Sequence, residues 1–275
     1  MKRYELLKIV KDKLAVSGVI DTSEAEFLLA LTLKIKRNEV FSNKTVSKNE
    51  EKQVYKNLKR RVKGVPISII FKSVNFYGRE FYVNTNCLAP RPETEELTAL
   101  VNENLTNKNA KILDLCTGSG AIAITLNLEF NFNNVMACDK SRMTLNIAKR
   151  NAKKLKSNVK FIKSNLFSKL NGQKFDFIVS NPPYISEEDY EHLDKVVRNF
   201  EPKMALVAKE NGLWFYKKII KLAPFYLNKD GKIAFEVGKN QAKLVARLLQ
   251  QDYNKIEIVK DLEGVDRMVI ATLGE

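Results

Sequence analysis

KILDLCTGSG, residues 111–120, carries the clearest indication of the fold. Its first half, Lys111–Leu115, is a short apolar segment that predicts a strand. In its second half, Gly118 and Gly120 lack Cβ atoms, so the backbone can turn tightly and approach a ligand closely. Open α/β sheets hold nucleotide-like cofactors at such a loop. Taken alone, the loop also matches the dinucleotide-binding pattern GxGxxA and is compatible with a purely structural turn.

Outward from this stretch, strands and helices alternate from residue 110 to the C-terminus. Further strands are predicted at 135–138, 159–162, 175–179, 232–237, 255–259 and 267–273. Helices are predicted through Leu145, Ala148 and Ala152, and over 213–222 and 241–249. Alternation of this kind predicts an α/β fold, in which helices cover both faces of a parallel sheet.

Residues 1–66 predict a small helical domain instead. Apolar residues recur there at helical spacing in two groups: Leu6, Leu7, Val10 and Leu14, then Phe27, Leu28, Leu31 and Ile35. Two capping boxes predict helix starts: Ser23 with Glu26, and Ser47 with Glu50. Residues 67–88 then change to a strand pattern around Gly78, which predicts a β-hairpin linking the helical domain to residues 89–275.

The composition narrows the class of protein. The chain has 275 residues, 44% hydrophobic and 29% charged, which is typical of a globular protein with a sizeable core. No stretch approaches the roughly 18 apolar residues of a membrane span. No apolar signal-peptide core follows the charged N-terminus, so we expect a cytoplasmic protein without membrane contact. The cysteines (Cys87, Cys116 and Cys138) and the one histidine, His192, disfavour a disulfide framework, a metal site and a Ser-His-Asp triad.

The net charge is +15, and residues 1–85 hold 18 basic and 9 acidic side chains. Within them, Lys44–Lys63 is densely basic. Such an excess is typical of proteins with an anionic partner, of which nucleic acid is the first candidate. A Lys-rich surface without interleaved aromatic residues is also common as plain solvated surface. Direct nucleic-acid binding therefore stays open at this point.

Asp139 is the second candidate for cofactor binding. It follows the predicted strand 135–138 and comes 19 residues after Gly120. A carboxylate at this point can accept both hydrogen bonds from a ribose diol, in NAD and in S-adenosylmethionine alike. Alternatively, Asp139 caps the helix that is predicted to start near Ser141.

The third motif is Asn181-Pro182-Pro183-Tyr184, directly after the strand 175–179. The two prolines fix the backbone and remove two N–H donors. The Asn181 side chain and the Pro182 carbonyl can then both accept hydrogen bonds from one planar NH₂ group, with Tyr184 flat against its π-face. This arrangement suits a planar amide or an exocyclic amine, and a hydride-transfer enzyme has no use for it.

With these motifs, the sequence resembles the release-factor glutamine N5-methyltransferase family over essentially the whole chain. The segments that carry the resemblance are 76–78 with 80–81, 90–95, 114–123, 165–167, 180–185, 201–202, 236–238 with Gln241, and Gly264-x-Asp266-Arg267. The motif Asn181–Tyr184 alone is shared with amino-methylating enzymes that act on DNA, RNA and protein. Arg91-Pro92-Glu93-Thr94 makes the match more specific.

The resemblance implies a Rossmann-like, seven-stranded class I methyltransferase domain at residues 89–275, with an antiparallel last strand. Residues 1–66 would be the helical domain that docks the substrate. The implied enzyme, a monomer, transfers a methyl group from S-adenosylmethionine and leaves S-adenosylhomocysteine. The acceptor is the side-chain amide nitrogen of the glutamine in the Gly-Gly-Gln motif of class 1 peptide-chain release factors.

The resemblance also implies roles for residues. Those expected to bind the cofactor are Cys116, Thr117, Gly118, Ser119, Gly120, Asp139, Leu166 and Asn181, with Asn165 beside Leu166 at the adenine. Those expected to bind the substrate are Asn181, Pro182, Pro183 and Tyr184, of which Asn181, Pro182 and Tyr184 are the expected catalytic residues. The segment Arg91–Glu95 would help to close the pocket.

Two positions depart from the family pattern. Cys116 stands where glycine is usual, and because cysteine is small the turn should survive there if φ is negative. Asn165 stands where aspartate is usual, and its carbonyl can still accept from an adenine amine. Two other functions stay in competition: a nucleic-acid methyltransferase acting on adenine N6 or guanine N2, and a non-catalytic protein that binds S-adenosylmethionine. An NAD-dependent oxidoreductase ranks behind both.

Overall fold

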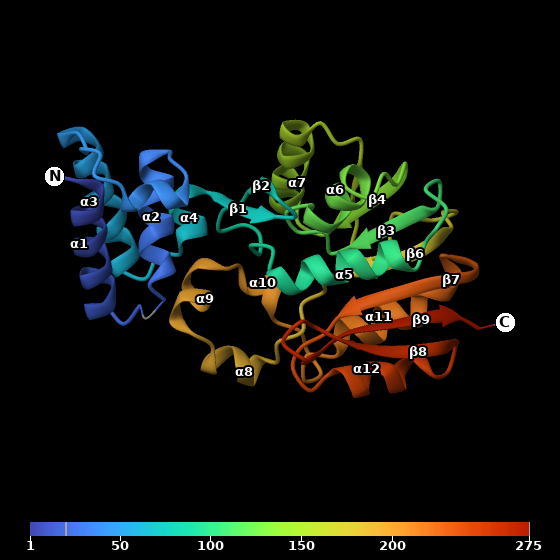
Figure 1. Ribbon diagram of the computed structural model, residues 1–275. Coiled ribbons are helices and arrows are strands. Elements are labelled where there is room, and N and C mark those ends of the chain that lie inside the picture. The colour runs from blue at the N-terminus through green and yellow to red at the C-terminus, as the bar shows by residue number, and fades with distance from the viewer. Residues whose placement is uncertain (20, 275) are drawn as a thin grey trace. The chain divides into compact units, whose positions relative to one another are not determined.

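The computed structural model describes residues 1–19 and 21–274, which divide into two compact units. The first unit contains residues 1–73 and 194–200, and the second contains residues 74–193 and the chain from Glu201 onward. Figure 1 shows a bundle of helices in the first unit and a sheet covered by helices in the second. Each unit has a hydrophobic core of its own.

The first unit is helical, as its apolar spacing predicts. Its elements are α1 (Arg3–Val16), α2 (Ser23–Leu33), η1 (Arg37–Phe41), α3 (Lys48–Val62), α4 (Ile67–Phe71) and α9 (Lys195–Phe200). The predicted face of α1 is confirmed, because Leu6, Leu7, Val10 and Leu14 are all buried. The capping box at α3 is confirmed too: the Glu50 N–H donates to Ser47 Oγ and the Ser47 N–H donates to Glu50 Oε2 at 2.8 Å.

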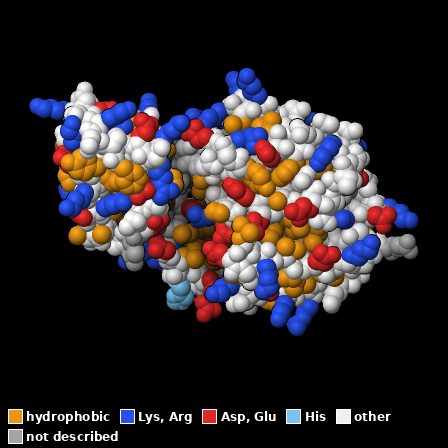
Figure 2. All heavy atoms as spheres, viewed as in Figure 1, with side chains coloured by type: hydrophobic (Ala, Val, Ile, Leu, Met, Phe, Trp, Pro, Cys, Tyr) orange, Lys and Arg blue, Asp and Glu red, His pale blue; other side chains and the backbone are white. Residues whose placement is uncertain are grey.

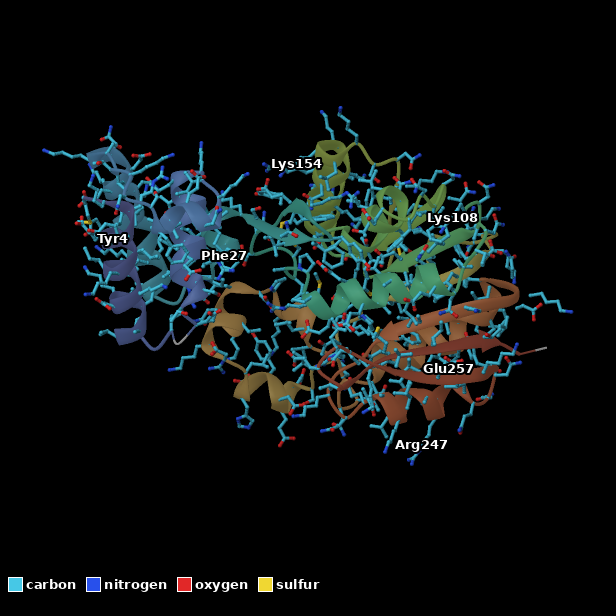
Figure 3. The ribbon with its side chains drawn as sticks, in the orientation of Figure 1. Tyr4, Phe27, Lys108, Lys154, Arg247 and Glu257 are labelled. Carbon is cyan, nitrogen blue, oxygen red and sulfur yellow. The ribbon has the colours of Figure 1, made fainter. Side chains whose placement is uncertain are left out.

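The prediction for α2 is wrong in two respects. Phe27 and Leu31, which the helical spacing groups on one face with Leu28, are 42% and 43% exposed. The buried leucines are Leu28, Leu29 and Leu33. Ser23 and Glu26 form no capping box, because the Glu26 carboxylate binds Lys11 at 3.0 Å and Arg37 at 2.8 Å instead. Figure 3 shows Phe27 at the surface of this unit. A helix whose apolar residues surround it leaves the choice of buried face to its neighbours.

The strand pattern predicted from residue 67 also begins too early. Residues Ile67–Phe71 form α4, in which the N–H groups of Ile69 and Ile70 donate to the Pro66 carbonyl at 3.0 and 2.9 Å. Proline at the start of this turn fixes a backbone angle that suits helix entry. The burial of Ile70 therefore outweighs the strand preference of β-branched residues.

The predicted hairpin follows, as β1 (Ser73–Phe76) and β2 (Arg79–Tyr82). Its turn contains Tyr77 and Gly78, which both have positive φ, at 49° and 68°. Phe76 and Phe81 from its two strands are buried in the core of the second unit. The hairpin is thus held to the second unit by these aromatic side chains.

The second unit is built on a seven-stranded sheet in the order β5-β4-β3-β6-β7-β9-β8. Its strands are β3 (Lys111–Leu115), β4 (Asn134–Asp139), β5 (Lys160–Lys163), β6 (Phe175–Ser180), β7 (Leu227–Glu236), β8 (Tyr253–Lys260) and β9 (Asp266–Leu273). The strands from β5 to β7 are parallel, whereas β9 runs antiparallel to both β7 and β8. The α/β fold and its antiparallel last strand are confirmed.

Helices cover both faces of this sheet. The helices of the second unit are α5 (Pro92–Glu103), α6 (Ala121–Leu128), α7 (Arg142–Leu155), α8 (Glu187–His192), α10 (Lys203–Leu206), α11 (Trp214–Leu222), η2 (Ala223–Phe225) and α12 (Ala242–Leu249). One core joins the sheet to α5, α6 and α7, and the other joins it to α11 and α12. Figure 3 shows the exposed side chains of Lys154 on α7 and Arg247 on α12 pointing away from opposite faces. His192 is exposed at the end of α8.

None of the helices in the described part of the chain is long and apolar enough to cross a membrane.

Candidate functional site

A pocket opens at the carboxyl ends of β3, β4, β5 and β6, with about 970 Å³ of space that is partly open to solvent. The predicted site residues that line it are Cys116, Thr117, Gly118, Ser119, Asp139, Asn165, Leu166, Asn181 and Pro183. Gly120, Pro182 and Tyr184 are not among its lining residues. Parallel strands bring their carboxyl ends to one sheet edge, so motifs separated by 65 residues, from Cys116 to Asn181, reach a single cavity.

The loop after β3 owes its shape to left-handed backbone. Cys116, Gly118 and Gly120 all have positive φ, at 61°, 57° and 84°. The turn is present although φ at Cys116 is positive, so it does not depend on the negative φ that was its stated condition. Glycine is usual at this position because it adopts a positive φ without strain.

The two glycines of this loop serve different purposes. A Cβ on Gly118 would meet no atom closer than the Cys116 carbonyl oxygen at 4.0 Å, so this position borders the open cavity. A Cβ on Gly120 would lie 3.0 Å from the Ile124 side chain and 3.2 Å from Ala148 Cβ. Gly118 leaves room for a ligand, whereas Gly120 lets α6 approach α7.

Asp114, near the end of β3, holds this loop through a hydrogen bond to Thr117. Its carboxylate is fully buried, and Oδ2 accepts a hydrogen bond from the Thr117 hydroxyl at 2.5 Å. Oδ1 is buried with no hydrogen-bond partner among the described residues. Burial raises the pKa of Asp114 to about 7. The sequence motif contains Asp114, but its supporting role follows only from the structure.

Asp139 ends β4 and faces the cavity. Its Oδ2 accepts from the Gly118 N–H at 3.1 Å, and its Oδ1 accepts from the Ser141 N–H at 2.9 Å. Burial raises its pKa, and these backbone donors oppose the rise. Asp139 therefore joins the first two loops, and the helix-capping interpretation and the binding interpretation are compatible, since each carboxylate oxygen can accept a second bond.

The loop after β5 contributes Asn165 and Leu166. Leu166 has positive φ, at 49°, and its carbonyl accepts from the Ser164 hydroxyl at 2.5 Å. The Ser164 N–H in turn donates to the Asp139 carbonyl at 3.0 Å. Leu166 is buried and Asn165 is exposed, so the pocket has an apolar and a polar side at this point.

The loop after β6, Asn181–Tyr184, is held by residues far away in the sequence. Gln241 Nε2 donates to the Tyr184 carbonyl at 2.9 Å, while Gln241 Oε1 accepts from the Gly238 N–H at 3.1 Å. A Cβ on Gly212, where φ is +83°, would lie 2.1 Å from the Tyr184 carbonyl oxygen. The sequence places Gln241 in the family resemblance, but it contains no signal for the contact of Gly212 with this loop.

Asn181 itself lies at the end of a buried polar chain. Its Nδ2 donates to Thr94 Oγ1 at 3.3 Å, and the Thr94 hydroxyl donates to Glu236 Oε2 at 2.6 Å. Thr94 and Glu236 are only 4% and 2% exposed. Burial raises the pKa of Glu236 to about 7. Both residues lie in motifs that carry the resemblance, yet sequence reasoning assigns neither to Asn181.

The segment Arg91–Glu95 reaches the pocket through Thr94. Arg91 forms an ion pair with Glu201 at 2.5 Å, and Glu95 Oε1 accepts from the Tyr77 N–H at 2.7 Å. Burial raises the pKa of Glu201, and Arg91 opposes the rise. The segment therefore connects the hairpin, the pocket and the loop before α10.

Comparison with known proteins agrees with this geometry. The family described as "Methyltransferase small domain" matches residues 92–216. A release factor glutamine methyltransferase of Bacillus cereus is 40% identical over 283 residues, covering 99% of this chain and 100% of the relative. This chain belongs to the release factor glutamine methyltransferase family. Members from Bacillus subtilis and Clostridium acetobutylicum are 35% and 34% identical, covering 98% and 100% of this chain and 97% of each relative.

Solved structures share the fold. A methyltransferase from Pyrococcus furiosus has a TM-score of 0.56 at 19% identity, covering 72% of this chain and 91% of that chain. A T. thermophilus 16S rRNA methyltransferase in complex with AdoMet and guanosine has a TM-score of 0.52 at 15% identity, covering 74% of this chain and 50% of that one. The predicted Rossmann-like class I methyltransferase fold is confirmed.

Proposed function

We propose that this protein transfers a methyl group from S-adenosylmethionine to the side-chain amide nitrogen of the glutamine in the Gly-Gly-Gln motif of class 1 peptide-chain release factors. The observation that carries the proposal is the position of Asn181 at the wall of the pocket, with its amide held by Thr94. Relatives of the same length that are 34–40% identical bear the name of this activity.

The pocket residues fit S-adenosylmethionine. Gly118 leaves open space at the cavity wall, where the methionine part would lie against Cys116–Gly120. The Asp139 carboxylate would accept from the ribose hydroxyls. Leu166 and Asn165 would border the adenine, the first by apolar contact and the second by a hydrogen bond. When bound, the cofactor supplies an electrophilic methyl group.

The loop Asn181–Tyr184, called the acceptor loop below, would bind and activate the amide that accepts the methyl group. An amide nitrogen is a poor nucleophile because its lone pair is delocalised into the carbonyl. Asn181 Oδ1 and the Pro182 carbonyl would accept hydrogen bonds from its two N–H groups and stabilise the positive charge that develops on the nitrogen. As the nitrogen takes the methyl group and the cofactor sulfur keeps the bonding pair, the methylated nitrogen loses one proton to solvent. Tyr184 would pack against the amide plane. Holding the acceptor in place supplies a further rate advantage through proximity.

Substrate docking would involve the first unit. We infer that residues 1–66 form a docking domain, that residues 67–88 link it to the methyltransferase domain at residues 89–275, and that the basic excess of residues 1–85 steers an acidic release factor. Because release factors work in the cytoplasm, the protein would be cytoplasmic too. One chain carries every residue proposed for the site, so a monomer would be sufficient for activity.

The test is transfer of labelled methyl from S-adenosylmethionine to purified release factor. The matched controls are a release factor whose Gly-Gly-Gln glutamine is changed to alanine, and bulk RNA. Label on the unaltered factor alone is the expected result. Binding of S-adenosylmethionine without label on any substrate would favour a non-catalytic protein.

A nucleic-acid methyltransferase is the second candidate, and the net charge of +15 is the observation that favours it. Figure 2 shows Lys and Arg side chains scattered over the visible face of each unit, with Asp and Glu among them. A nucleic-acid groove concentrates positive charge along one path instead. Label on RNA alone would overturn the release-factor proposal.

A further inference from the structure

We propose that Thr94 and Glu236 are positioning residues: they hold the Asn181 amide so that its NH₂ group points away from the methyl acceptor and its Oδ1 is presented to it. The inference rests on the proposed function in one respect, because it takes Asn181 as the residue that accepts a hydrogen bond from the substrate amide. The orientation of Asn181 itself rests on contacts within this chain.

The direction of the hydrogen bonds sets the orientation. An ionised Glu236 carboxylate can only accept, so the single hydroxyl hydrogen of Thr94 is committed to Glu236 Oε2, 2.6 Å away. Thr94 Oγ1 can then only accept from Asn181, and the atom that donates to it at 3.3 Å is Nδ2. No donor from residues 1–19 or 21–274 bonds to Asn181 Oδ1, which remains available for the substrate N–H.

Orientation matters because the two ends of an asparagine amide have opposite hydrogen-bonding character. Turned by 180°, Asn181 would offer N–H donors to the N–H bonds of the acceptor, and the acceptor would lose a partner at the point where positive charge develops. The rotation of a free asparagine side chain costs little. A partner behind the amide is therefore needed to keep the productive orientation, and Thr94 is placed to be that partner.

The protonation state of Glu236 couples this orientation to pH. A protonated Glu236 can donate to Thr94, which frees the Thr94 hydroxyl to donate to Asn181 and favours the reversed amide. The titratable and charged groups around Glu236 are Glu93 on α5, Arg267 on β9, Tyr184 after β6 and Tyr216 on α11. Burial has the largest effect and raises the pKa of Glu236 to about 7. The hydrogen bond from Thr94 opposes this rise, as do Arg267 and the Asn181 amide, whereas the charge of Glu93 adds to it.

The first experiment compares three threonine variants in methyl transfer. Thr94→Val keeps the shape and removes the hydroxyl, so kcat should fall by about tenfold or more, with KM for the release factor changed by less than about threefold. Thr94→Ser keeps the hydroxyl and should recover most of kcat. Thr98→Val is the matched control: Thr98 is also buried on α5, but its hydroxyl donates to the Thr94 carbonyl at 2.8 Å. It should leave kcat unchanged.

The second experiment measures the NMR signals of the Asn181 side-chain amide directly, without a release factor. In ¹⁵N-labelled protein, the NH₂ signals that disappear in Asn181→Ala identify this side chain. They should shift with pH around a midpoint near 7 in the unaltered protein, following Glu236. They should lose this shift in Glu236→Gln, which cannot titrate, and in Thr94→Val. Asp114→Asn should retain the shift, which separates Glu236 from the other buried carboxyl group with a pKa of about 7.

Two results would overturn the proposal. One is a kcat for Thr94→Val within about twofold of the unaltered enzyme, since the amide would then need no partner behind it. The other is an Asn181 NH₂ signal with the same pH response in Glu236→Gln. Failure of the proposed function looks different: no transfer by the unaltered protein to the release factor, while the NH₂ signals still follow Glu236.

Discussion

Two loops meet at the pocket, and they are shaped in different ways. The loop Cys116–Gly120 is made by its own backbone, with positive φ at 116, 118 and 120. The loop Asn181–Tyr184 has no such residue and is held by side chains that are distant in the sequence: Thr94 is 87 residues from Asn181, and Gln241 is 57 residues from Tyr184. The first loop is therefore shaped mainly by its own backbone, although its Gly118 N–H also donates to the distant Asp139 carboxylate. The second loop is shaped mainly by contacts with distant residues.

Because of this difference, different substitutions should disturb the two loops. The loop Cys116–Gly120, called the cofactor loop below, depends on how well its own residues adopt positive φ, since backbone strain is a property of the residue that bears it. The acceptor loop depends on the packing and hydrogen bonds of residues that never touch a substrate. Mutations outside residues 181–184 should therefore disturb the acceptor loop more than the loop's own sequence suggests.

The largest effect is expected at Gly212. In Gly212→Ala the new Cβ would lie 2.1 Å from the Tyr184 carbonyl oxygen and 2.5 Å from Gln241 Nε2. Left-handed strain and the clash together should lower the free energy of unfolding by about 3–5 kcal/mol. Urea unfolding measures this. Gly172→Ala is the matched control, because φ there is +75° with no atom within 4 Å of the new Cβ. Equal losses in the two variants would mean that Gly212 does not support the acceptor loop.

Asn181→Ala tests the acceptor loop from within. It should lower the rate of methyl transfer by about 10² or more, or about 3 kcal/mol of transition-state stabilisation, because a preorganised acceptor is lost. The urea midpoint should stay close to that of the unaltered protein, since Asn181 is only partly buried. Single-turnover kinetics with the release factor measure the rate. A near-normal rate would remove Asn181 from its assigned role.

Asp114→Asn probes the support of the cofactor loop through pH. The folded protein holds the Asp114 proton up to about pH 7, whereas the unfolded chain releases it near the ordinary value of 3.8. Stability therefore falls as pH rises through this window, because only the unfolded chain releases the proton there. The variant has no such proton, so its stability relative to the unaltered protein should rise by on the order of 3 kcal/mol between about pH 4.5 and 7.5. A difference that does not vary with pH would contradict this.

Cys116→Gly should have the smallest effect. Relief of left-handed strain at Cys116, where φ is +61°, favours the variant. Loss of the thiol packed against the core and the greater freedom of glycine in the unfolded chain oppose it, so the net change should stay within about 1 kcal/mol. Thermal and urea unfolding give the value. A loss above about 2 kcal/mol would show that the Cys116 side chain, more than the backbone, shapes this loop.

Local sequence patterns were sufficient for one class of features. The alternation of strands and helices predicted the sheet, and the stretch 111–120 predicted the strand, the turn and the helix that follow one another there. These patterns gave wrong predictions where packing against other elements determines which side chains are buried. Phe27 and Leu31 fit a helical face as well as Leu28 does, and only the packing of the bundle leaves them exposed. The sign of φ at Cys116 was equally inaccessible, because a small side chain is compatible with either sign.

The class of fold, the family and the motifs around the pocket follow from the sequence alone, because hydrophobic period, glycine and proline act over a few neighbouring residues. The folded chain is needed to show that Thr94 and Glu236 lie behind Asn181, and that Gly212 and Gln241 lie against Tyr184. These contacts join α5, β7 and the turn before α11 to the loop after β6. They exist because the parallel sheet brings its strand ends to one edge, and no spacing along the chain encodes that meeting directly.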